Sequence, residues 1–131
     1  MVGLLAGCGT RQTFEAEFGL SLPKGVIVAD SFHVQHGPDC SHFFRLTHWQ
    51  EEDLGNFVST ARLEQWTGEP TTLLPVNVPG PPPSKLPNWW DRKRLLALPE
   101  IYGRMDKSTE RFWWIFVDRD QSELYVNSGE W

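Results

Sequence analysis

The sequence predicts an α+β fold, in which one main helix over residues 50–66 and several short helices pack on a mostly antiparallel sheet of about five strands. Two observations carry this prediction. Segments rich in β-branched and aromatic residues lie on both sides of the helical segment. Turn signals separate neighbouring segments, so the order is strand, strand, helix, long loop, strand, strand, strand.

The first elements lie between residues 14 and 47. Phe14 and Phe18 are four residues apart on one helical face and Gly19 follows them, which predicts a short helix. Residues 26–34 are rich in β-branched side chains and alternate in polarity in their second half. Residues 42–47 return after the turn at Gly37-Pro38-Asp39, which predicts a hairpin.

The register of this hairpin is predicted with even-numbered residues opposite even-numbered ones. This pairing separates an apolar face from a mixed one. The apolar face would carry Val28, Phe32, Val34, Phe44 and Leu46. The mixed face would carry Ser31, His33, Gln35, Phe43, Arg45 and Thr47.

The main helix follows the hairpin. Thr47 and Gln50 have the spacing of a capping box, and Leu54, Phe57 and Ala61 follow helical periodicity. Gly68 and Pro70 would close the helix. Prolines are then frequent in residues 75–87, which predicts an extended loop.

The last third predicts a short helix over residues 92–98 and three strands. The strands are expected at residues 101–105, 111–117 and 123–127. The middle strand is apolar on both faces, which predicts a central position in the sheet. Phe112, Trp114 and Phe116 would lie buried on one face, and Trp113, Ile115 and Val117 on the other.

Length and charge limit the class of protein. The 131 residues suit one globular domain, placed here at residues 14–131, and the net charge is −5. No run of basic residues is longer than Arg92-Lys93-Arg94, so a nucleic-acid partner is not expected. No stretch of 18 apolar residues occurs, so a complete transmembrane helix is not expected either.

The N-terminus carries the most specific motif. Leu5-Ala6-Gly7-Cys8 resembles the lipobox of small bacterial lipoproteins, in which the cysteine is acylated. The resemblance implies a lipid on Cys8, with residues 1–13 forming the truncated end of a signal peptide and a tether. Gly9 follows the cysteine instead of aspartate, which by the same resemblance implies the outer membrane, facing the periplasm.

All four histidines lie between residues 33 and 48, with Asp39 and Cys40 among them. In the predicted register His33 points away from the others, so the candidate metal ligands at the hairpin tip are His36, Asp39, Cys40 and His42. The alternative is a polar hairpin end without a metal. A nucleophilic pair of Cys40 with a histidine has no evident third group to orient it. No cofactor is predicted.

A second candidate site follows the proline-rich loop. Trp89 and Trp90 offer aromatic area for a protein partner, and Asp91 beside them offers a charge. Alternatively, both rings pin the loop to the sheet. The sequence thus predicts a lipid-anchored, non-catalytic interaction module of the bacterial envelope. An inhibitor or immunity-type protein is one form that such a module could take, given the small size, the acidic charge and the expected location. The competing hypothesis is an enzyme that binds a metal or small ligand at the hairpin tip. Histidine and cysteine atoms converging in a concave pocket would favour the enzyme, whereas a flat aromatic patch would favour the interaction module.

Overall fold

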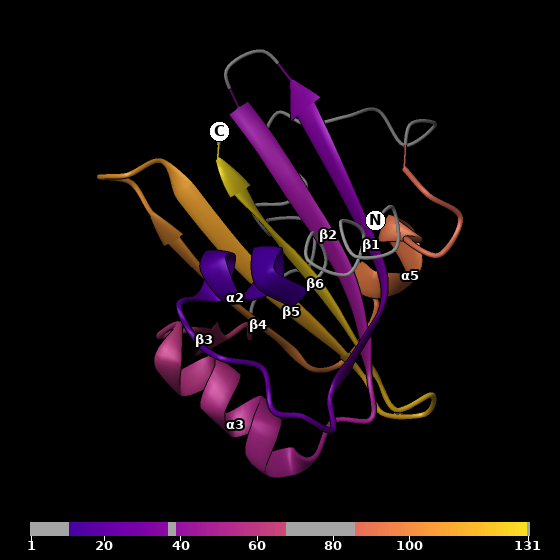
Figure 1. Cartoon of the computed structure of the whole chain (residues 1–131). Helices are drawn as coiled ribbons and strands as arrows, with labels where there is room; N and C mark the ends of the chain where they lie inside the picture. Colours follow the sequence, from indigo (N-terminus) through magenta and orange to yellow (C-terminus); the bar gives the residue numbers. More distant parts are fainter. Residues whose placement is uncertain (1–10, 37–38, 68–85, 131) are drawn as a thin grey trace, which may run out of the picture.

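The computed structural model describes residues 11–36, 39–67 and 86–130 (Figure 1). Within these residues, one antiparallel sheet has the strand order β1-β2-β6-β5-β4-β3. The strands are β1 (Ile27–His36), β2 (Asp39–Thr47), β3 (Glu64–Gln65), β4 (Ile101–Asp106), β5 (Arg111–Asp118) and β6 (Glu123–Glu130). The helices are α2 (Thr13–Phe18), α3 (Glu51–Thr60) and α5 (Arg92–Leu96). The α+β prediction is confirmed, and the two-residue strand β3 is added to the five expected strands.

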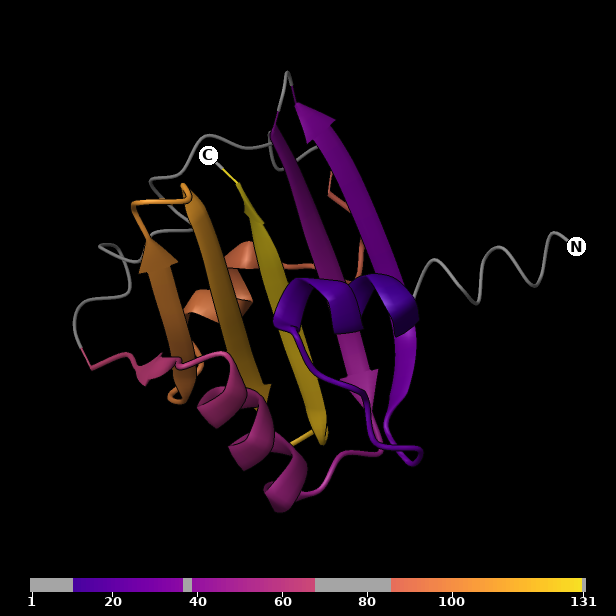
Figure 2. The ribbon, with the colours of Figure 1, turned by 60° about the vertical axis from the view of Figure 1, so that its left-hand side comes forward.

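Helices cover both faces of the sheet. α2 and α3 lie on one face and α5 lies on the other (Figures 1 and 2). On the α2/α3 face, Phe14 and Phe57 from the helices pack with Phe44 and Ile115 from the sheet in a first core. On the α5 face, a second core is built mainly of aromatic rings, namely Phe43, Trp90, Phe112, Trp114, Phe116 and Tyr125, with Leu95 and Ile101.

Strand β5 contributes side chains to both cores, as its sequence predicts. Trp113, Ile115 and Val117 belong to the first core. Phe112, Trp114 and Phe116 belong to the second, and all six side chains are buried. The central position of β5 between β6 and β4 explains why neither face of this strand is polar.

The predicted hairpin register is correct only at its base. Val28 lies opposite Leu46, but Asp30 lies opposite Arg45, so Ala29 is an extra residue on β1. This β-bulge shifts the pairing by one residue and exchanges the faces beyond it. Phe32 therefore lies opposite Phe43 and packs against the second core, not beside Phe44 as predicted.

The helices differ from the prediction mainly at their ends. α2 ends as expected, with Gly19 in the left-handed conformation at φ 65°. The Asp53 carboxylate caps α3 by accepting the backbone N–H of Gln50 at 2.8 Å, so the helix starts beyond the expected box at Thr47. Arg62 adopts φ 56°, which ends α3 at Thr60, before the predicted residue 66, and turns the chain into β3.

Several predictions fall on residues that the structure does not describe. They include the lipobox with Cys8 and most of the loop at residues 75–87. The helix expected at residues 92–98 is present but ends at Leu96. None of the described helices has the length and apolar character needed to cross a membrane.

Candidate metal centre

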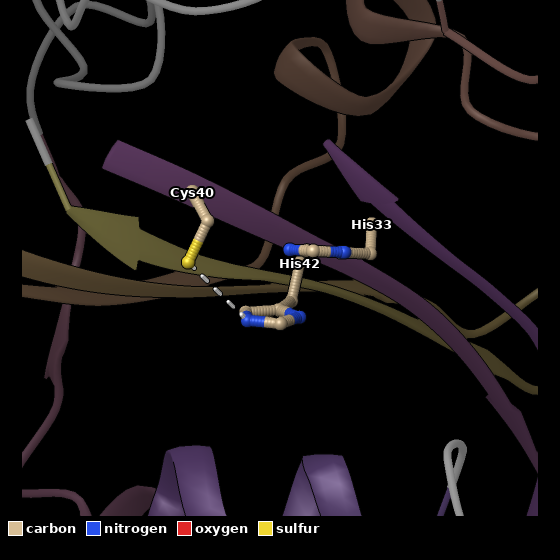
Figure 3. Close-up of side chains that lie close together, drawn as sticks. All are labelled: His33, Cys40 and His42. Atoms are coloured by element: carbon tan, nitrogen blue, oxygen red, sulfur yellow. Dashed lines mark hydrogen bonds between the residues drawn. The ribbon is translucent and has the colours of Figure 1, made fainter. Parts of the chain in front are cut away.

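Three potential metal ligands converge on the α2/α3 face of the hairpin. His33 comes from β1, and Cys40 and His42 come from β2 (Figure 3). One ligand atom from each residue lies within 4.8 Å of the other two. Cys40 Sγ lies 3.8 Å from His42 Nε2. The arrangement brings a thiol and two imidazoles together, which is a donor set suited to Zn²⁺.

The bulge at Ala29 creates this convergence. Because the register is shifted, His33 lies directly opposite His42, and Gln35 lies opposite Cys40. The prediction that His33 points away from His42 is therefore wrong. Of the four ligands predicted, the structure brings Cys40 and His42 together, whereas the side chains of His36 and Asp39 lie outside the described parts.

The sequence did contain a signal for the shifted register. Even-to-even pairing gives Asp30 the same face as Val28 and Phe32, which would place a carboxylate among core side chains. In the structure Asp30 instead accepts a hydrogen bond from Arg45 Nε at 2.7 Å. The charge at position 30 thus marks the place where the strand changes face.

Two carboxylates lie close enough to complete the centre. Glu130 Oε1 is 3.8 Å from Cys40 Sγ, and Glu17 Oε2 is 3.9 Å from His42 Nε2. A tetrahedral zinc ion with its usual bond lengths separates a sulfur from a nitrogen ligand by about 3.5 Å. The observed separation of Cys40 Sγ and His42 Nε2 is close to this value, so small side-chain movements would suffice for these two ligands.

His33 needs a larger movement. Its ring is stacked on that of His42, with centroids 4.7 Å apart and planes inclined by 14° (Figure 3). Nitrogen lone pairs lie in the ring plane, so two parallel imidazoles do not aim at a common ion. Apart from this stacking contact, His33 is exposed, so other side-chain rotamers are open to it. Coordination therefore requires this exposed ring to rotate.

The local electrostatics favour a bound cation over a nucleophilic thiol. Burial, followed by the charges of Glu130 and Glu17, raises the pKa of Cys40, so the thiol keeps its proton at neutral pH. Burial lowers the pKa of His42, which keeps its imidazole neutral and a lone pair available. A metal ion would place a positive charge beside these carboxylates and displace the thiol proton.

Glu17 is held in place by the sheet. Its Oε1 accepts hydrogen bonds from Arg111 Nη2 at 2.8 Å and from Ser128 Oγ at 2.7 Å. Its backbone carbonyl accepts the indole N–H of Trp113 at 2.8 Å. These contacts fix α2 over β5 and β6 and keep the second carboxylate oxygen directed at His42.

In the other predicted site, at residues 89–91, most side chains have a structural role. Trp90 is 6% exposed and packs edge-on against Phe43, so its ring is not available at the surface. Asp91 caps α5 by accepting the backbone N–H of Arg94 at 3.2 Å. Trp89 is half-buried and is the member of this group whose ring is partly accessible.

Comparison of the chain with protein-family models, with curated proteins and with solved structures gave no match. The assignment of a function therefore depends on the geometry and chemistry of the described residues.

Proposed function

We propose that this protein is a non-catalytic module that binds a transition-metal ion, with Zn²⁺ as the best-fitting ion, and that it is held in the bacterial envelope by a lipid on Cys8. The observation that carries the proposal is the convergence of ligand atoms from His33, Cys40 and His42 within 4.8 Å. Thiolate and imidazole ligands favour zinc over Mg²⁺ and Ca²⁺, which prefer oxygen.

The number of available ligands supports binding without catalysis. Three side chains with Glu130 or Glu17 as a fourth would fill a tetrahedral coordination sphere. Zinc ions in closed four-ligand sites serve structure or binding, whereas catalytic zinc keeps a position open for water or substrate. The raised pKa of Cys40 further argues against a thiolate nucleophile.

Metal binding is testable with the full chain. We expect Zn²⁺ to raise the melting temperature, because an ion at 100 times its dissociation constant stabilises the fold by about 2.7 kcal/mol. Co²⁺ should give visible absorption bands of a tetrahedral site and a sulfur charge-transfer band. Cys40→Ser should weaken Zn²⁺ binding by at least about tenfold and abolish the sulfur band.

His48→Asn is the matched control for this experiment. His48 is exposed, lies outside the cluster and has φ 60°, a conformation that asparagine tolerates. Zinc affinity should be unchanged in this variant. Equal affinity of Cys40→Ser and the wild type would contradict the proposed centre.

The anchor is tested separately. Its support is the motif Leu5-Ala6-Gly7-Cys8, which places small residues before a thiol as lipoprotein processing requires. Behind a complete signal peptide, the wild type should label with palmitate and fractionate with the outer membrane, whereas Cys8→Ser should do neither. Unlabelled wild type would contradict the anchor without affecting the metal proposal.

Binding of a protein partner, as by an inhibitor or immunity protein, is a second candidate function. The net charge of −5 favours a basic partner, and part of the Trp89 ring is accessible for contact. Trp89→Ala should then weaken capture of that partner while the fold is retained.

A further inference from the structure

Among the described residues, no strand pairs with the outer edge of β1. This strand is the first in the sheet order and pairs only with β2, so it forms the edge opposite β3 (Figure 2). Over its ten residues, backbone N–H and C=O groups alternately point toward β2 and away from it. The groups that point away from β2 are able to accept a further strand.

The two edges of the sheet differ in their protection against strand addition. β3 has only two residues, Glu64–Gln65, and one of them is charged. Short edge strands and charged side chains are the usual means of preventing pairing between sheets. Residues 30–35 of β1 contain no lysine, arginine or proline, and the carboxylate of Asp30 is bound by Arg45 Nε at 2.7 Å. Beyond its bulge, β1 therefore lacks the protection that β3 has.

The two sides of residues 30–35 differ in polarity. Phe32 and Val34 lie on the α5 face, because they alternate with His33, which lies on the α2/α3 face with the metal centre. Phe32 packs against the second core, whereas Val34 belongs to neither core. Both side chains are half-buried, so part of their apolar surface is accessible at the edge of the sheet. A partner strand would cover this surface.

The pattern of the segment is self-complementary. Antiparallel pairing of two copies about a two-fold axis at His33 places Phe32 of each copy opposite Val34 of the other. It also places Ser31 opposite Gln35. Residues directly opposite each other share a face of the sheet, so apolar side chains meet on one face and polar side chains on the other. Aromatic and β-branched residues form favourable cross-strand pairs.

Charge also favours this register. An axis at Phe32 would place Asp30 opposite Val34, a carboxylate against an apolar side chain. With the axis at His33, the two Asp30 residues lie at opposite ends of the paired segment, and each is bound by Arg45 of its own copy. Although each chain carries a net charge of −5, pairing in this register brings no like charges directly opposite each other.

We propose that two copies of this chain form a symmetric dimer in which their β1 strands pair antiparallel about His33, so that the two sheets join into one. The dimer does not depend on the proposed metal binding, because main-chain groups and the Phe32–Val34 contacts on the opposite face hold it together. The segment 30–35 forms a small interface, so we expect a dissociation constant in the micromolar range.

The test is sedimentation equilibrium of the full chain at concentrations from about 1 µM to about 1 mM, with EDTA present. A monomer–dimer equilibrium is expected. EDTA removes metal ions and so excludes a dimer that is bridged by zinc between two His33 side chains. A chain that remains monomeric at about 1 mM, or that dimerises only without EDTA, overturns the proposal.

A mixture of ¹³C-labelled and unlabelled chains tests the register. An isotope-filtered nuclear Overhauser experiment detects contacts between copies and suppresses those within one copy. It should show the Phe32 ring of one copy close to the Val34 methyl groups of the other, because directly opposed side chains are neighbours. A dimer without this contact contradicts pairing through β1 in the proposed register.

Val34→Lys separates dimerisation from folding. Val34 lies in neither core, so the variant should retain the melting temperature of the wild type. A lysine on the edge strand should raise the dissociation constant at least about tenfold. Asn56→Lys adds the same charge at an exposed position of α3 and should dimerise like the wild type. Equal dimerisation of Val34→Lys and the wild type would overturn the proposal.

Discussion

Two polar clusters, one on each face of the sheet, differ in how closely their groups are paired. On the α5 face, polar groups pair with one another at hydrogen-bonding distance: Tyr125 donates to Glu123 at 2.8 Å and Arg94 donates to Asp118 at 2.8 Å. On the α2/α3 face, Glu17 is paired equally closely with Arg111 and Ser128. Beside it, the polar contacts of the Cys40 and His42 side chains within the described residues are longer, at 3.8 Å to each other and 3.8–3.9 Å to carboxylates. A closely paired polar network stabilises a fold, whereas converging groups without short partners are available for a ligand.

The largest loss of stability is expected when a ring is removed from the aromatic core of the α5 face. Trp90→Ala should lower the free energy of unfolding by about 3–5 kcal/mol, because the ring is 6% exposed and packs against Phe43 and Tyr125. Trp89→Ala, at a half-buried position, should cost distinctly less. Denaturant melts of both variants measure this difference in the free energy of unfolding. Equal losses would contradict the larger structural role of Trp90.

A smaller effect is expected at Gly103, where the same face has no space for a methyl group. Gly103→Ala should destabilise by about 1–3 kcal/mol, because the Trp114 ring must move. Gly55→Ala is the control: its Cβ would meet nothing within 4 Å in the middle of α3, so the variant should gain about 0.5–1 kcal/mol. Thermal melts measure the expected loss of stability in Gly103→Ala and the expected gain in Gly55→Ala. An unchanged stability of Gly103→Ala would contradict the close packing of Trp114.

The smallest effect concerns the α2/α3 face. Glu17→Gln should cost about 1 kcal/mol, because it removes the ion pair with Arg111 but keeps an acceptor for Ser128. The charge of Glu17 raises the pKa of His42 against the larger effect of burial, so the variant should lower that pKa further. A pH titration of the His42 ring by NMR measures the shift.

The sign of the accompanying pH dependence follows from the direction of that shift. The pKa of His42 lies below the ordinary value of 6.5 in the folded protein, so folding favours the neutral ring. This contribution to stability is present above pH 6.5 and is lost as the pH falls through the folded pKa. An unchanged His42 pKa in Glu17→Gln would show that the carboxylate does not act on this imidazole.

The sequence predicts most of the fold because the spacing of apolar residues shows which side chains are buried. The unbroken apolar run of β5 and the Phe14–Phe18 spacing in α2 both lead to the observed cores. The predicted element boundaries are wrong where one backbone conformation, or a very short element, overrides the pattern of apolar residues. The left-handed φ of Arg62 ends α3 early, and β3 is too short to give a periodic signal.

The candidate metal centre could be predicted only in part for the same reason. Clustering along the chain identifies Cys40 and His42, but one extra residue at Ala29 decides whether His33 joins them. The contribution of Glu17 and Glu130 comes from distant elements, and no local pattern shows that they meet at this hairpin.

The strand order has a consequence for how the protein is made. β2 lies between β1 and β6, so residues 41–46 obtain their second strand partner only when residues 124–129 have left the ribosome. Until then the nascent chain exposes the edge of β2 and the apolar side of Phe44 and Leu46, a hazard for aggregation during vectorial synthesis. His33, Cys40 and His42 all emerge with the early hairpin, so an ion that bridges β1 and β2 would hold the nascent hairpin together while the rest of the sheet is translated.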